Sequence, residues 1–263
     1  RKEQALYYRR CLMDLGIPLP DDLTAWIALF MMVVARLSFV IFFLPGIGEQ
    51  VIPTRARAFV LIGVALAMTT SGFIEAPVAT ELTGLFSLLM MEIFIGFGLG
   101  VVLRLTIWML MIAGSVIAQS IGLAQFLAPA LEHEAQTLTA NMLSIAGAAV
   151  LLSVNFHVEV IVSLLRLYAD IPLGALTLLS GPMVAQSFYA AFGFALLLAW
   201  PFVAVNLLYN ICLGFINKAL PSLMVAFVGA PFMVGAGTMM LALSIAGILL
   251  AWKDRAMQVV WWI

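Results

Sequence analysis

Long apolar runs separated by short polar breaks dominate this chain. A helix needs about 20 mainly apolar residues to cross the roughly 30 Å hydrocarbon core of a bilayer. The breaks are too short to fold as separate soluble domains. The pattern therefore predicts one all-α membrane domain over residues 23–252, with an N-terminal juxtamembrane tail at 1–22 and a C-terminal tail at 253–263. The candidate runs are Leu23–Leu44, Ala58–Ile74, Leu82–Leu103, Leu105–Leu127, Leu138–Leu165, Gln186–Leu213 and Leu223–Trp252.

Charged residues interrupt several of these runs. Arg36 lies in the first, Glu92 in the third, and His157 and Glu159 in the fifth. A charge near the bilayer centre costs about 2.5–3.5 kcal/mol on insertion scales. These side chains therefore need partners, which other helices, other subunits or an aqueous path would supply. The basic residues between the runs do not favour one side of the membrane, so no topology is predicted.

The stretch from Glu92 to Pro129 is the least ordinary part of the chain. Gly96 and Gly100 are four residues apart, and the same spacing returns downstream in small residues, which is typical of helices that approach closely in membranes. Serines and glutamines interleave with the second set, and such side chains at membrane depth face protein or water. A pore-lining or gate-forming element is one interpretation, and ordinary helix packing is the other. The downstream residues are Gly114, Ser115, Ala118, Gln119, Ser120, Gly122 and Gln125.

Composition narrows the class of protein. Of the 263 residues, 65% are hydrophobic and only 10% are charged, far from the roughly 25% charged residues of soluble domains. The net charge of −1 gives no reason to expect nucleic acid as a partner. Cys11 and Cys212 are distant and lack the spacing of a disulfide framework or metal site, so buried free thiols are expected.

Two short motifs have alternative interpretations. Pro53 followed by Arg55 and Arg57 predicts a helix start whose basic side chains serve either as membrane-surface anchors or as contacts to another subunit. His133-Glu134 misses the His-Glu-x-x-His zinc motif because Thr137 occupies the second histidine position. No nucleophile elbow or phosphate-binding loop is present either. No enzyme activity, metal or cofactor is therefore expected.

In their order along the chain, these pieces resemble the FliR family of flagellar export-gate proteins and its injectisome counterpart, the SctT family. The resemblance spans about residues 24–250. One departure concerns the family's Pro-Gln-Met-Asn-Val-Phe segment, which reads Pro221-Ser-Leu-Met-Val-Ala here and lacks the two amides. The matching pieces are Arg36-Leu-Ser38 with Pro45, Pro53-x-Arg55-x-Arg57, Glu92 to Gly100 with Arg104, Gly114 to Gly122, Pro172-Leu-Gly174, Leu213-Gly214 with Pro221, and Gly229-x-Pro231.

The resemblance implies a non-enzymatic subunit of a type III protein export gate, in the bacterial inner membrane and within the flagellar basal body or an injectisome. Its fold would be tilted helical hairpins with broken helices, assembled with FliP-like and FliQ-like subunits and an FlhB-like protein. Unfolded export substrates would pass through the assembly.

The family's channel plug maps onto a loop after the third run, comprising Gly114, Ser115, Ala118, Gln119, Ser120, Gly122, Gln125 and Phe126. Residues expected in helix packing or subunit contact are Arg36, Pro53, Arg55, Arg57, Glu92, Gly96, Gly100, Arg104, Pro221, Gly229 and Pro231.

A secondary transporter is the competing hypothesis. In that case Glu92, Arg104 and the broken helices would form a midplane site for a small solute. Many transporters are built from internal repeats, and the glycine-rich third run has no counterpart in the second half of this chain.

Overall fold

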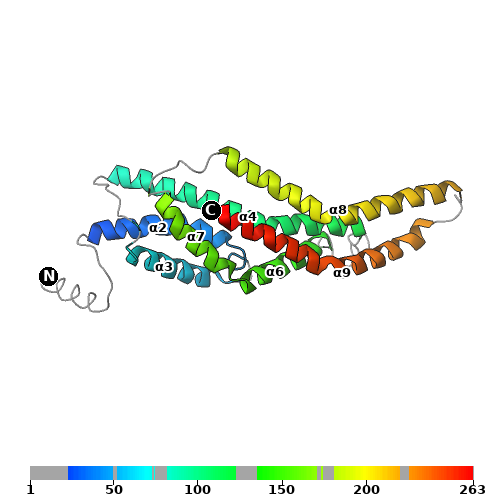
Figure 1. Ribbon diagram of the computed structural model, residues 1–263, viewed down its shortest axis with the longest axis horizontal. Helices are drawn as coiled ribbons and strands as arrows, with labels where there is room; N and C mark the ends of the chain where they lie inside the picture. The colour runs from blue at the N-terminus through cyan, green and yellow to red at the C-terminus, as the bar shows by residue number, and fades with distance from the viewer. Residues whose placement is uncertain are drawn as a thin grey trace. The chain divides into compact units, whose positions relative to one another are not determined.

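The computed structural model describes residues 23–49, 52–72, 74, 82–122, 135–170, 173, 181–219 and 225–262, and all regular structure in this part is α-helical (Figure 1). The prediction of an all-α membrane protein is therefore confirmed. Residues 1–22, predicted as a tail, lie outside the described residues, whereas residues 253–262 are helical. The helices are α2 (Leu23–Phe43), α3 (Thr54–Thr70), α4 (Leu82–Ile121), α6 (Ala135–Ser153), α7 (Phe156–Asp170), α8 (Gly181–Ala219) and α9 (Val225–Trp262).

The predicted break at Arg104 is wrong. Leu82–Leu103 and the following run belong to a single helix, α4, which has 40 residues and ends at Ile121. Arginine is a good helix former, and neither proline nor a left-handed glycine interrupts the backbone near Arg104. At 1.5 Å per residue the helix is about 60 Å long, twice the thickness of a hydrocarbon core.

Backbone geometry, rather than charge, sets the helix ends that are described. The run predicted at Leu138–Leu165 breaks between α6 and α7, where Asn155 has a φ of 57°. Asparagine is one of the few residues other than glycine that enter this left-handed region readily. Pro231 lies inside α9, and Pro201 lies inside α8. Each proline removes only one backbone hydrogen bond, and the helix continues past it.

Four helices are long and apolar enough to cross a membrane, and α6 with α7 would make a fifth if they form one broken span. These four are α2, α4, α8 and α9. Helix α3, which was also predicted as a span, has only 17 residues in the structure. The described part of the chain is thus a multi-pass helical protein with fewer candidate spans than apolar runs.

The chain divides into two compact units. The first contains α2, α3, α4 as far as Arg104, and α7 from His157. Helices α2 and α3 lie side by side in it (Figure 1). Helix α2 buries residues at three- and four-residue intervals, as expected for one helical face turned inward. These residues are Leu29, Met32, Val33, Arg36, Leu37, Val40 and Ile41.

The second unit contains α4 from Leu105, α6, and most of α8 and α9. Trp252 of α9 is completely buried in this unit. Its indole N–H donates a 2.7 Å hydrogen bond to the main-chain oxygen of Thr106 in α4. A Cβ at Gly147 of α6 would lie 3.0 Å from the Trp252 ring, so this glycine leaves room for the indole. One tryptophan thereby joins three helices of this unit.

Candidate functional site

The two charges predicted at membrane depth, Arg36 of α2 and Glu92 of α4, bind each other. The Arg36 guanidinium donates through Nε to Oε2 of Glu92 at 2.5 Å and through Nη2 to Oε1 at 3.0 Å. Neither side chain has any solvent exposure. Two parallel hydrogen bonds from a planar guanidinium to a carboxylate form the strongest common ion-pair geometry. The cost of burying each charge is therefore offset within the first unit.

Tyr168 of α7 covers the same guanidinium. The Arg36 Cζ atom lies 4.2 Å from the centroid of its ring, within the range of a cation–π interaction. The tyrosine is also buried, and no described residue bonds its hydroxyl. The ring therefore contributes more to this site than the hydroxyl does. Three helices meet at Arg36, although only two of the three residues were singled out in the sequence.

Gly96 and Gly100 lie where α4 passes α2. A Cβ at Gly96 would be 2.9 Å from Cα of Arg36, and one at Gly100 would be 2.7 Å from the main-chain oxygen of Phe39. Phe97, between them, contacts the ring of Phe39 edge-on at 5.5 Å between centroids. The missing side chains thus bring the two backbones together close to the Arg36–Glu92 pair.

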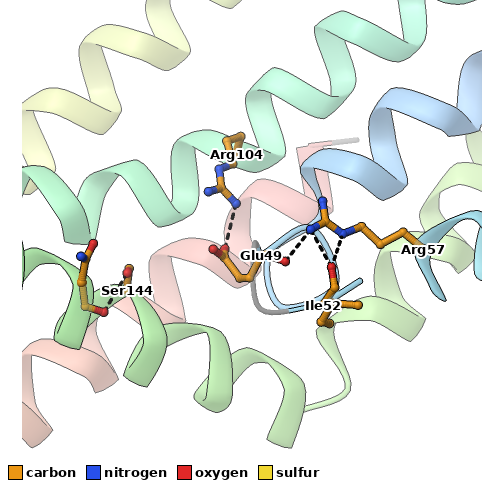
Figure 2. A network of polar contacts seen from close by, with 6 residues as sticks. Glu49, Ile52, Arg57, Arg104 and Ser144 are labelled. Carbon is orange, nitrogen blue, oxygen red and sulfur yellow. Dashed lines mark hydrogen bonds and ion pairs between the residues drawn. The ribbon is translucent and has the colours of Figure 1, made fainter. Parts of the chain in front are cut away.

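Arg104 pairs with Glu49 in the connection between α2 and α3 (Figure 2). Arg104 Nη1 donates to Oε1 of Glu49 at 2.8 Å, and the two side chains are 18% and 22% exposed. Arg57 holds the same connection by donating to the main-chain oxygens of Glu49 and Ile52, each at 2.8 Å. Neither arginine projects freely into solvent.

The two bases at the start of α3 therefore have different surroundings. Helix α3 begins after Pro53, as predicted, without a side-chain cap. Arg57 is engaged in the connection before α3, whereas the Arg55 side chain is exposed. The transporter hypothesis relied on Glu92 and Arg104 as solute ligands. Both side chains are already paired within the first unit, so the charges that suggested a solute site have partners in this chain.

The predicted plug segment is helical as far as it is described. Residues 114–121 are the last turns of α4, whereas the resemblance implied a loop, and Gly122 follows with a φ of 75°. A Cβ at Gly114 would lie 2.7 Å from Cα of Ala140 in α6, and Ala118 is completely buried. Gln119 is exposed. The small residues thus pack within the second unit, while one amide faces outward.

The other predicted plug residues either form hydrogen bonds within α4 or lie outside the described residues. The hydroxyls of Ser115 and Ser120 donate to main-chain oxygens of their own helix, those of Ile112 and Val116, each at 2.8 Å. Gln125, Phe126 and Pro221 lie outside the described residues. In α9, Gly229 faces the Tyr209 hydroxyl of α8, and Pro231 is exposed.

The expectation of a buried thiol at Cys212 is wrong, because Cys212 of α8 is free and exposed. Cys11 lies outside the described residues.

Comparison with known proteins decides the family. The model of bacterial export proteins, family 1, matches residues 27–259. The chain belongs to this family. Arg36, Glu92, Arg104 and Gly229 all lie within the stretch that matches bacterial export proteins, family 1.

Curated relatives in this export family carry one name, flagellar biosynthetic protein FliR. The protein of that name from Caulobacter vibrioides is 30% identical over 233 residues, which are 85% of this chain and 91% of the relative. The one from Aquifex aeolicus is 26% identical over 80% of this chain and 82% of its own length. The one from Escherichia coli is 26% identical over 83% and 84%, respectively. The resemblance to the FliR family is therefore confirmed.

Sequence reasoning missed Glu49, Tyr168 and Trp252, each of which contacts other helices or connections within its own unit. The sequence could have suggested an ion pair at Glu49, because this acid lies in a short connection close to Arg55 and Arg57. Nothing in the sequence pointed to Tyr168 or Trp252, since an aromatic residue in an apolar run is ordinary. Their positions depend on which helices of this export protein become neighbours.

Proposed function

We propose that this chain is a non-enzymatic subunit of the flagellar protein export gate in the bacterial inner membrane, within the basal body. The observation that carries the proposal is the family match over residues 27–259, together with relatives named flagellar biosynthetic protein FliR along most of their length. The internal pairing of Arg36 with Glu92 supports it, because each of these buried charges already has a partner within the chain.

The gate would be a hetero-oligomer. In this proposal the chain assembles with FliP-like and FliQ-like membrane subunits, contacts an FlhB-like protein, and forms part of the channel for unfolded substrates. The exposed surface of its long helices supports the proposal. Only 22% of the most apolar window of α8 and 17% of that of α9 is buried within the chain, against 44% for α2. Apolar surface of this extent is covered by lipid or by other subunits.

The deciding experiment is co-expression with the neighbouring membrane-protein genes, extraction in mild detergent and native mass spectrometry. The expected result is one copy of this chain with several copies of two small helical membrane proteins. A stable monomer or homodimer that binds a solute would contradict the export-gate assignment and support a transporter.

The end of α4 is the proposed channel plug. Gln119 is exposed while its neighbour Ala118 is fully buried, so the two positions form a matched pair. In a variant lacking the native cysteines, a cysteine replacing Gln119 should react with a small water-soluble thiol reagent in the assembled gate. A cysteine replacing Ala118 should not react. Equal protection of both positions, in an assembly that still exports, would contradict a plug that faces the lumen.

A further inference from the structure

The last part of α8 carries a row of amide side chains on an otherwise apolar surface. Asn206, Asn210 and Asn217 fall within about 40° of one another around the helix, since each residue advances by about 100°. Leu208 and Phe215 lie on the opposite side and are 63% and 71% exposed. This segment of α8 thus has an apolar side and an amide side.

Contacts with α9 fix where the amide side lies. Tyr209 and Leu213 of α8 face Gly229 of α9. Asn210 and Asn217 are each offset from these two residues by about one third of a turn or less, so the amide row runs beside the line of contact between the two helices. Asn210 is exposed there and Asn206 is half-buried. The row therefore borders the α8–α9 contact and leaves the apolar side free for lipid or for neighbouring subunits.

The side-chain amides of Asn206 and Asn210 share a hydrogen bond that uses only some of their donors and acceptors. The Asn210 Nδ2 group donates to the main-chain oxygen of Asn206 at 2.8 Å and to its Oδ1 atom at 2.9 Å. The N–H groups of the Asn206 amide and the Oδ1 atom of Asn210 have no bond to another described residue. The pair consequently presents two donor N–H groups and an acceptor to whatever covers this face.

We propose that this amide row binds the main chain of an extended polypeptide. The proposal rests on the proposed export function and names the part of the gate that touches the substrate. Residues four apart on a helix are about 6 Å apart along its axis, and an extended chain directs a peptide N–H and C=O to one side about every 6.6–6.8 Å. Asn206 and Asn210 therefore match successive main-chain groups along one edge of such a chain.

Amide side chains suit a substrate of any sequence. Every peptide bond offers one donor and one acceptor, and asparagine offers both in return. Lipid chains offer neither, so they would leave the free amide groups unsatisfied at a cost. A partner helix has already used its main-chain groups in its own hydrogen bonds. An extended chain is the occupant that pairs with this row irrespective of its side chains.

Photo-crosslinking in cells tests this contact. A benzoylphenylalanine replaces either Asn210 or Leu208 in the full-length chain within the assembled gate, and a substrate fused to a tightly folded domain is stalled in transit. The expected result is a covalent adduct with the stalled substrate from position 210, at least about tenfold more abundant than from position 208. Adducts from position 210 only with another membrane subunit or with lipid, with the substrate stalled, would overturn the proposal.

A paired substitution provides the second measurement. Asn206→Leu with Asn210→Leu keeps the branched shape and the number of heavy atoms of each side chain and removes the amides. A net hydrogen bond is worth about 1 kcal/mol, or about fivefold. Secretion should fall by about fivefold or more while the subunits co-purify as before. The control variant Leu208→Ala should secrete normally. Unchanged secretion by the paired variant would contradict the amide contact. If the unsubstituted chain never forms a complex, or if its complex never holds a stalled substrate, the export function itself would be contradicted.

Discussion

Arg36 and Glu92 are fully shielded from solvent, and each supplies the compensation that the other needs. Removing one partner of such a pair leaves an uncompensated buried charge and typically costs about 3–5 kcal/mol. Glu49 and Arg104 form an ion pair of similar chemistry that is partly open to solvent. An ion pair that water and salt can reach is usually worth about 0–1 kcal/mol, because they screen it. The two pairs therefore differ in what they contribute to stability.

Arg36→Met should destabilise the protein strongly, by about 3–5 kcal/mol, because the Glu92 carboxylate loses its counter-charge. The measurement is thermal unfolding of the purified complex in detergent. Arg104→Met is the matched control, with an expected cost of about 0–1 kcal/mol. Combining Arg36→Met with Glu92→Leu should cost less than the sum of the single changes. Similar losses from Arg36→Met and Arg104→Met would show that burial does not separate the two pairs.

The contribution of Tyr168 to stability should come from its ring and not from its hydroxyl. Tyr168→Phe keeps the ring over Arg36 and removes a buried hydroxyl that no described residue bonds, so stability should be unchanged or slightly higher. Tyr168→Leu loses the cation–π interaction and some packing, and should cost about 1–3 kcal/mol. Thermal unfolding of both variants in one detergent checks this. A larger loss for phenylalanine than for leucine would mean that the hydroxyl has a partner.

Among helices, α4 approaches α2 closely enough in the first unit that an added Cβ at Gly96 would meet the α2 backbone. Gly96→Ala should weaken the contact between these helices by a few kcal/mol, because the added carbon would meet the Arg36 main chain, which cannot move as a flexible side chain does. Gly193→Ala in α8 is the control, since nothing lies within 4 Å of an added Cβ there. The control should be neutral or more stable by up to about 1 kcal/mol, since alanine favours helix. Unfolding temperatures that fall equally for both variants would contradict the close approach.

Spacing in the sequence was enough to predict helices and a close-packed stripe, but not the ends of the helices. The four-residue interval of Gly96 and Gly100 marks one face of α4 whatever its neighbour is. Arg104 suggested a boundary because an apolar-run count stops at a charge, yet a helix ends where its backbone conformation changes, as at Asn155 and Gly122. The partner of Arg104 could not be found by spacing, because Glu49 lies 55 residues away along the chain.

Across the described chain, the candidate spans differ in how much of their apolar surface is covered. Helix α2 of the first unit is the most enclosed of the candidate spans, whereas α8 and α9, which lie mainly in the second unit, are mostly open. Segments with few buried contacts open more readily and exchange their amide hydrogens faster. The α8 segment from Val205 to Ala219 should therefore be stabilised mainly by its surroundings in the assembly.

Hydrogen exchange followed by mass spectrometry measures this difference. In the isolated chain in detergent, amides of Val205–Ala219 should exchange faster than those of Leu29–Ile41 in α2. After assembly with the other subunits, the α8 segment should become protected, while α2 should change little. Equal protection of the α8 segment before and after assembly would contradict its covering by neighbouring subunits.

The ion pair between α2 and α4 cannot form until both of its residues have been synthesised, so Arg36 is without Glu92 for part of translation. Arg36 and Glu92 are 56 residues apart in the chain. At about 5–20 residues per second, roughly 3–11 s pass between the synthesis of the arginine and that of the glutamate. Throughout that interval the nascent first helix holds a charge without its final partner. During insertion, the Arg36 guanidinium therefore requires a polar environment until Glu92 emerges from the ribosome. Water, the lipid headgroups or the insertion machinery would supply it.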